Sequence, residues 1–178
     1  TNYLKKLQNI GYNLNVEVLN SQYFETATSR ERLIIIGIRK DLNKLPSHPR
    51  PFCKPITFGE ATKHITVTEA EKDKLKVTSK RVLYYLNYTK QGEQCSKYNQ
   101  NQSYFSHRRA SMIKPCPTIT TTIDIYHPFE NRTLSIKEIK AISSFPDDFK
   151  LVGSYAQQYE RIGRAVPPNL MKHIALHL

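Results

Sequence analysis

Two arginines stand directly before the most apolar run of the chain. Arg30 and Arg32 precede residues 33–38, which read Leu-Ile-Ile-Ile-Gly-Ile. A guanidinium can donate hydrogen bonds to a carbonyl oxygen and stabilise negative charge that develops there. The same two residues could instead lead into a strand and pair with acids such as Glu25. The residue types alone leave both interpretations open.

A second group of candidate side chains is basic and hydroxylated. Arg108, Arg109 and Lys114 are candidates for contacts to phosphates or to guanine. Thr118 and Thr120 follow closely and could touch a nucleic-acid backbone. The alternative is a solvated basic loop followed by an edge strand.

The overall charge favours a polyanionic partner. The 178-residue chain has 27 Lys and Arg against 15 Asp and Glu, a formal net charge of +12. Such an excess suits nucleic acid or an anionic membrane surface, with a merely solubilising surface as the plain alternative. No apolar run approaches the roughly 20 residues that span a bilayer, so no membrane-spanning segment is predicted.

Neither a metal site nor a disulfide framework is indicated. His173 and His177 lie four residues apart, a spacing that metal ligands use, but no third ligand accompanies them. The three cysteines form no CxxC pair and no even set, which favours a reducing, cytoplasmic location.

Hydrophobic periodicity predicts an α/β chain. Residues 2–10 have helical spacing that Gly11 can end, and residues 12–19 alternate as a half-buried strand. The continuous run at 33–38 suits a strand covered on both faces.

The middle of the chain is less regular. Residues 43–54 are rich in proline and read as a linker, whereas residues 117–125 have strand character. Residues 93–109 read as a polar loop with interspersed aromatic side chains, among them Tyr104 and Phe105, of the kind that lies on a charged partner.

Three capping boxes predict where helices begin. These boxes are Thr68–Glu71, Ser135–Glu138 and Ser154–Gln157. Gly163 is placed to end the helix that Ser154 opens. Pro168 fits the first turn of a final helix.

The closing third of the chain resembles the last two motif blocks of the DNA (cytosine-5) methyltransferases. The first block here is Arg132-Thr-Leu-Ser-Ile-Lys-Glu138, preceded by His-Pro and followed by a Ser-Phe-Pro-Asp-Asp-Phe turn. The second is Gln158-Tyr-Glu-Arg-Ile-Gly-Arg-Ala-Val-Pro-Pro168. Two earlier stretches also fit, because Arg30 and Arg32 fall on the family's Arg-x-Arg element and residues 115–120 resemble its Pro-Ser-Pro-Thr-Ile-Thr element.

This resemblance implies roles for the candidate residues. In the family the second arginine of the pair contacts a cytosine flipped out of double-stranded DNA, which points to Arg32, with Arg30 supporting the catalytic loop. Within the recognition element, Thr118 and Thr120 could touch the DNA backbone or the place left by the flipped base. Arg108, Arg109 and Lys114 remain candidates for DNA contacts to phosphates or guanine. The last block lines the S-adenosylmethionine pocket, which points to Gly163, Arg164, Ala165 and Val166, although the family has Asn where this chain has Arg164.

The family's catalytic motifs are missing from this sequence. It has no Phe-x-Gly-x-Gly cofactor loop, no Pro-Cys-Gln nucleophile and no Glu-Asn-Val segment. Cys116 lies between prolines but lacks the following Gln, so we interpret it as structural. The chain is therefore expected to be the recognition half of a bacterial- or phage-type enzyme, inactive alone, and to act with an N-terminal catalytic chain or segment that carries Pro-Cys-Gln.

The resemblance also implies an architecture. Residues 1–42 would end a Rossmann-like catalytic sheet, 43–126 would form a small mixed target-recognition domain, and 127–178 would return as helices to the catalytic domain. One alternative is a DNA-binding module without a catalytic partner. Another, a membrane-surface protein, depends on charge alone.

Overall fold

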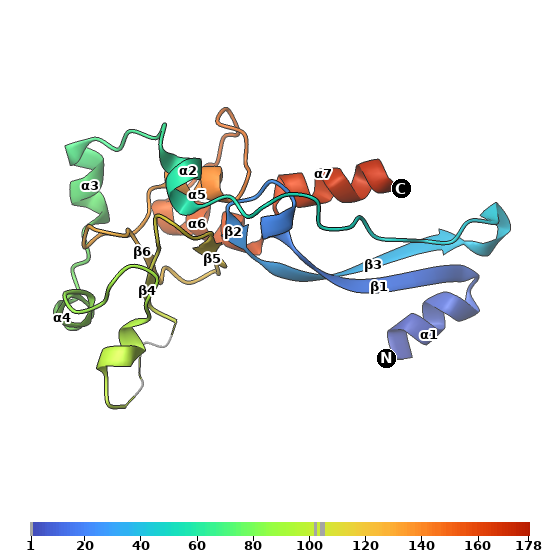
Figure 1. The fold of residues 1–178 in the computed structure, drawn as a ribbon, viewed down its shortest axis with the longest axis horizontal. Helices are drawn as coiled ribbons and strands as arrows, with labels where there is room; N and C mark the ends of the chain where they lie inside the picture. The colour runs from blue at the N-terminus through green and yellow to red at the C-terminus, as the bar shows by residue number, and fades with distance from the viewer. Residues whose placement is uncertain (1, 102, 104–105) are drawn as a thin grey trace.

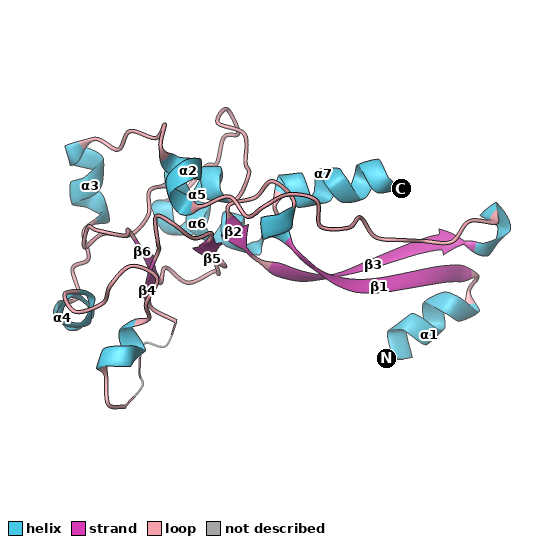
Figure 2. Ribbon diagram, viewed as in Figure 1, coloured by secondary structure: helices cyan, strands magenta, loops and turns pink. Residues whose placement is uncertain are grey.

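A computed structural model describes residues 2–101, 103 and 106–178, so Tyr104 and Phe105 of the polar loop lie outside the described residues. Figure 2 shows helices, two long strands (β1 and β3), several short strands and long connecting loops. The helices are α1 (Asn2–Asn9), α2 (Phe58–Thr62), α3 (Glu69–Leu75), α4 (Lys80–Leu86), α5 (Ile136–Ile142), α6 (Tyr155–Arg164) and α7 (Pro168–His177), with 3-10 helices η1 (Ser21–Tyr23), η2 (Lys40–Leu42) and η3 (Cys95–Tyr98). The strands are β1 (Tyr12–Asn20), β2 (Thr28–Ser29), β3 (Glu31–Arg39), β4 (Arg108–Arg109), β5 (Cys116–Pro117) and β6 (Ile125–Tyr126).

A long arm is formed by β1 and β3, which pair antiparallel from Tyr12↔Arg39 to Asn20↔Glu31. Figure 1 shows this arm reaching away from the rest of the chain, with α7 on one side and α1 near its tip. Gly11 has φ +102° at the turn from α1 into β1, a conformation that glycine adopts without strain. The helix and strand predicted for residues 2–19 are confirmed.

The two faces of this arm differ. On one face Leu19 and Ile36 are buried against Phe24, Leu170 and Ile174, so α7 covers it. The opposite face, defined here as the open apolar face, consists of Leu14, Val16, Val18, Leu33 and Ile35, which share a face by their register. Leu33 is 62% exposed and Val18 61%. The prediction of a strand covered on both faces is therefore wrong for the described chain, because Val18 and Leu33 on this second face are left largely exposed.

The predicted linker connects the arm to the remaining helices. Between η2 and α2 the chain has neither helix nor strand. It runs back along the covered face, where Asn13 and Asn15 donate from Nδ2 to the carbonyl oxygens of Lys44 (3.4 Å) and Pro46 (3.3 Å). This segment thus helps α7 to cover one side of the arm (Figure 1).

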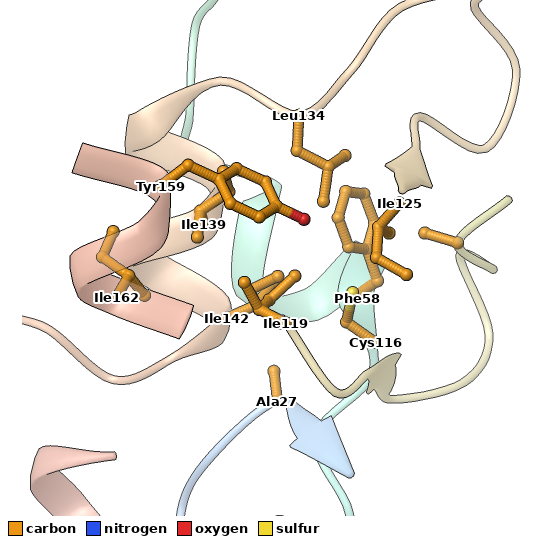
Figure 3. Close-up of a cluster of buried hydrophobic side chains, with 11 residues drawn as sticks. Ala27, Phe58, Cys116, Ile119, Ile125, Leu134, Ile139, Ile142, Tyr159 and Ile162 are labelled. Carbon is orange, nitrogen blue, oxygen red and sulfur yellow. The ribbon is translucent and has the colours of Figure 1, made fainter. Parts of the chain in front are cut away.

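The main core lies at the other end of the molecule. Figure 3 shows side chains from distant parts of the sequence converging there, and they are Ala27, Phe58, Ala110, Cys116, Ile119, Ile125, Leu134, Ile139, Ile142, Tyr159 and Ile162. Each is at most 2% exposed. Residues 1–42, 43–126 and 127–178 all contribute, so the three segments expected from the sequence share one core.

The capping boxes at Thr68, Ser135 and Ser154 are confirmed at the starts of α3, α5 and α6. Pro168 occupies the first turn of α7 as predicted.

Two local predictions are wrong. Residues 118–124 are not a strand, because their backbone turns between β5 and β6 and pairs with neither. Gly163 does not end α6, which continues to Arg164. Glycine is needed at 163 because a Cβ there would collide with the backbone of Thr120.

Among the described residues, no helix is long and apolar enough to cross a membrane.

Candidate nucleic-acid interface

An open groove of about 420 Å³ lies where β2, β4, β5 and β6 meet. Its lining consists of Ser29, Ser106, Arg108, Pro115, Pro117, Thr118, Thr120, Asp124 and Ile125. Three of the residues proposed from sequence for DNA contact, Arg108, Thr118 and Thr120, are thus brought together. Lys114 is exposed just before the groove-lining Pro115.

The floor of the groove depends on a parallel pairing between β2 and β5. Thr28 pairs with Cys116, and its hydroxyl donates to the carbonyl oxygens of Cys116 (3.2 Å) and Pro117 (3.1 Å). Thr118 donates from Oγ1 to the carbonyl oxygen of Ser29 at 2.6 Å. The segment before the Arg-x-Arg pair therefore holds the Pro-Cys-Pro-Thr element in place.

Thr120 is the more accessible of the two threonines. Its hydroxyl closes a local turn, because it accepts from the Thr122 backbone N–H at 3.1 Å and lies 3.2 Å from the Thr122 carbonyl oxygen. The residue is exposed at the rim of the groove. A hydroxyl in this position can exchange its local bond for one to a phosphate or a base edge.

Asp124 is a groove residue that the sequence analysis missed. It is only 3% exposed, and its Oδ1 has no hydrogen-bond partner. Burial raises the pKa of this carboxyl to about 6, although the charge of Arg108 acts in the opposite direction. The backbone N–H of Arg108 donates to the Asp124 carbonyl oxygen at 3.0 Å, so the two residues are held side by side. In the sequence, this residue could have been noticed as a single acid between Ile123 and Ile125.

Arg109 lies next to Arg108 in sequence but points into the protein. The residue is 5% exposed. Its Nε donates to Thr89 O, Nη1 to the carbonyl oxygens of His127 and Glu130, and Nη2 to Leu86 O and to Asn131 Oδ1. A guanidinium has five N–H donors, so this one has none left for DNA. Arg109 joins α4 to the segment before α5 instead of lying on the interface expected from its sequence.

The two arginines before β3 have different environments. Arg30 is 3% exposed and donates from Nη1 to Ile119 O (2.6 Å) and from Nη2 to Gly163 O (2.5 Å). Burial, together with the charge of Arg32, lowers the pKa of this guanidinium to about 10. Arg32 is half-buried, and its Nη1 donates to Glu31 O at 2.6 Å.

The acid suggested as their structural partner is engaged elsewhere. Glu25 Oε2 lies 3.0 Å from His173 Nε2. Among the described residues, no Asp or Glu side chain forms an ion pair with Arg30 or Arg32. Pairing with Glu25 therefore does not explain why two arginines stand here.

The residues proposed for cofactor binding are placed by packing. Gly163 is buried, while Arg164 is exposed and pairs with Glu160 at 2.5 Å on the surface of α6. Val166 is partly buried against the apolar cluster between the arm and α7. The small cavity beside Ala165 has no volume that a water molecule could occupy. Residues 163–166 alone therefore do not fit S-adenosylmethionine.

The described residues contain no group of three potential metal-ligating side chains. His177 Nε2 lies 2.8 Å from Ser47 Oγ, and the His173 ring lies 4.4 Å from that of Phe52. Both histidines thus fasten α7 to the linker segment.

Known structures share this fold. A protein from an E. coli prophage described as a DNA modification methyltransferase matches with a TM-score of 0.75 at 17% identity, covering 97% of this chain and 62% of that one. The Entamoeba histolytica methyltransferase EhMeth matches with a TM-score of 0.65 at 14% identity, covering 99% of this chain and 56% of that one.

Sequence relatives are closer in identity. The type II methyltransferase M.Sau96I of Staphylococcus aureus is 34% identical over 94% of this chain and 43% of its own length. M.PspPI of a Psychrobacter species is 31% identical over 94% of this chain and 46% of its own length. The chain thus spans about half the length of these relatives. The family model for C-5 cytosine-specific DNA methylases matches residues 1–178, so the chain belongs to that family.

Proposed function

We propose that this chain is the DNA-recognition half of a DNA (cytosine-5) methyltransferase. The complete enzyme would transfer a methyl group from S-adenosylmethionine to carbon 5 of a cytosine flipped out of the duplex. The observation that carries the proposal is the groove in which Arg108, Thr118 and Thr120 converge beside the Arg-x-Arg segment.

The groove has chemistry suited to DNA. A guanidinium such as that of Arg108 can bind a phosphate or donate to guanine O6 and N7, and threonine hydroxyls can bond to either backbone or base. Lys114 adds a positive charge close by, and the chain as a whole carries a net charge of +12. Arg109 is not part of this surface.

Arg32 is our candidate for contact with the flipped cytosine. Its guanidinium is half-buried, and the bond to Glu31 O uses one of its five donors. The remaining donors could hold the carbonyl oxygen of the ring and stabilise charge that develops on it. Arg30, whose terminal nitrogens bind carbonyl oxygens inside the chain, would support the site through position.

The nucleophile must come from outside this sequence. Cys116 is 0% exposed, and burial raises the pKa of its thiol far above the ordinary value. Burial also raises the pKa of the Cys95 thiol. A thiol of this kind is a poor nucleophile, because the thiolate is the reactive form. Cys53 is half-buried, but Lys54 follows it where the family has Gln. With no Pro-Cys-Gln in the sequence, we expect a catalytic chain or segment to supply the attacking cysteine.

The open apolar face offers a place for that catalytic part. Val16, Val18, Leu33 and Ile35 are between 37% and 62% exposed on adjacent strands. Contiguous exposed apolar side chains indicate a surface that another polypeptide covers. The relatives are about twice as long as this chain. We therefore assign a catalytic part like theirs as the occupant of this face. Together with the arm it would complete a Rossmann-like domain.

The cofactor would be bound mainly by the same missing part. When bound it supplies the methyl group. Residues 163–166 enclose no suitable cavity here, so we assign them no step of the reaction.

A reconstituted enzyme tests this function. The catalytic part from the same source is combined with the chain, and methyl transfer to unmethylated plasmid DNA is measured. We expect Arg32→Ala to depress transfer severely while DNA binding largely survives. The matched control is Arg39→Ala at the far end of the same strand, whose side chain is exposed and paired with Asp41. Near-normal transfer by Arg32→Ala would remove the role given to Arg32.

A second candidate is a DNA-binding module without a catalytic partner. Arg164 favours it, because a cation stands where the family has an amide, and here it forms a surface pair with Glu160. Cofactor-dependent methylation by any reconstituted complex excludes this candidate.

A further inference from the structure

The tightest backbone contact of a glycine in this chain joins α6 to the groove. A Cβ added to Gly163 would lie 1.9 Å from the carbonyl oxygen of Thr120, 2.6 Å from its carbonyl carbon and 3.2 Å from the Thr121 nitrogen. All three are backbone atoms, so no side-chain rotation can make room. Glycine inside a helix costs about 0.5–1 kcal/mol relative to alanine, and here it allows this close approach.

Arg30 strengthens the same contact from the other side. Its Nη1 binds Ile119 O at 2.6 Å and its Nη2 binds Gly163 O at 2.5 Å. Two nitrogens of one rigid, planar group therefore fix residue 119 against residue 163. Thr118, one residue earlier, is held by Ser29.

We propose that Gly163, together with Arg30, is the positioning element that sets Thr120 at the rim of the groove for contact with duplex DNA. Neither residue touches the DNA. Gly163 lets the Thr120 backbone sit against α6, and Arg30 prevents it from moving away. This inference rests on the proposed function of the groove, and it differs from the cofactor role that the family resemblance implies for Gly163.

The principal variant is Gly163→Ala. To restore a carbon–oxygen contact of roughly 3.3 Å, the Thr120 backbone has to retreat by more than about 1 Å. A displacement of that size breaks a hydrogen bond at the rim, so binding to a labelled, unmethylated plasmid fragment should weaken about ten-fold or more. The salt dependence of binding should keep its slope, because Arg108 and Lys114 remain in place.

The matched control is Gly37→Ala in β3. A Cβ there would lie 3.1 Å from Leu14 Cδ2, which is the flexible end of a side chain, and Gly37 is not among the residues that line the groove. We expect unchanged DNA affinity. Arg30→Lys is the milder second variant, because a single ammonium cannot bind both carbonyl oxygens in the same geometry. We expect several-fold weaker binding, and less than additive loss when it is combined with Gly163→Ala.

Amide chemical shifts of residues 118–122 provide a readout that does not depend on DNA. The proposal predicts that Gly163→Ala and Arg30→Lys move these shifts and that Gly37→Ala does not. Equal DNA affinity of all variants would overturn the positioning role while the function of the groove stands. If the original chain does not bind DNA, the proposed function fails, and unmoved shifts in both variants would then overturn the positioning role as well.

Discussion

The main core and the arm use the same kinds of side chain in opposite ways. In the main core Ile119, Ile125 and Ile139 are at most 2% exposed. On the open apolar face of the arm, Leu33 and Ile35 are 62% and 40% exposed. The first region is closed by segments of this chain, whereas the second is left exposed by the described residues.

The difference in exposure between the two regions corresponds to a difference in the free energy of burial. Burying one aliphatic side chain fully contributes about 1.5–3 kcal/mol. The main core has already gained this contribution, and the open apolar face still offers it to a partner. The region around the main core should therefore keep its structure alone, and we expect the arm to gain stability if a partner covers it.

The largest effect is expected from Arg109→Ala, which attacks the self-contained region. The change removes the Arg109 donors to the carbonyl oxygens of Thr89, His127 and Glu130, and one of the two donors to the carbonyl oxygen of Leu86. We expect the free energy of unfolding to fall by about 4 kcal/mol, measured by urea denaturation. A loss below about 1 kcal/mol would show that this region does not depend on its buried arginine.

A somewhat smaller effect is expected from Leu33→Asp on the open apolar face. The chain alone should keep its stability within about 0.5 kcal/mol, because the side chain is already exposed. Association with the catalytic part should weaken by about 3 kcal/mol, roughly a hundred-fold in Kd, measured by titration calorimetry. Leu176→Asp is the control, since Leu176 is 74% exposed at the end of α7. Equal effects of both variants would argue against docking on the arm.

Asp124→Asn tests whether the charged form of the buried Asp124 carboxyl destabilises the folded chain. Because burial raises the folded-state pKa of this carboxyl to about 6, the folded state binds the proton more tightly than the unfolded state. The associated stability is present below about pH 4 and is lost as the pH rises through 6. At pH 8 the Asn variant should thus be about 2 kcal/mol more stable than the original chain, with no such gain at pH 4. Thermal unfolding at the two pH values measures this, and a difference independent of pH would contradict a raised pKa.

The smallest effect is expected from replacing the N-cap serine of α5 or of α6. Ser135 is 6% exposed and forms its box with Glu138, which also binds Arg132 at 2.8 Å through two oxygens, whereas Ser154 is exposed. Replacement by Ala should cost about 1.5 kcal/mol at Ser135 and about 0.5 kcal/mol at Ser154. Equal losses in urea denaturation would show that burial adds nothing to the cap.

Local signals explain which elements were predictable. A capping box needs only residues three positions apart, and Gly11 ends α1 within its own turn, so both could be identified in the sequence. The family motifs located the groove, because Thr118 and Thr120 fall within one of them.

The remaining features depend on contacts between distant segments. Gly163 looked like a helix end, but the atom that requires glycine there belongs to Thr120. Arg108 and Arg109 are adjacent and alike, yet one lines the groove and the other is saturated by carbonyl oxygens from elsewhere. The exposure of Leu33 could not be predicted from its apolar run, because such a run does not indicate which face of the strand the distant segments of the chain cover.

The most direct test is methyl transfer from labelled S-adenosylmethionine to unmethylated plasmid DNA, measured beside DNA binding. The chain alone and the chain with its Pro-Cys-Gln-bearing catalytic part are compared. We expect the chain alone to bind DNA weakly and to transfer nothing, and the catalytic part to restore transfer. Transfer by the chain alone, or a complex whose DNA binding does not depend on this chain, would contradict the proposed recognition role.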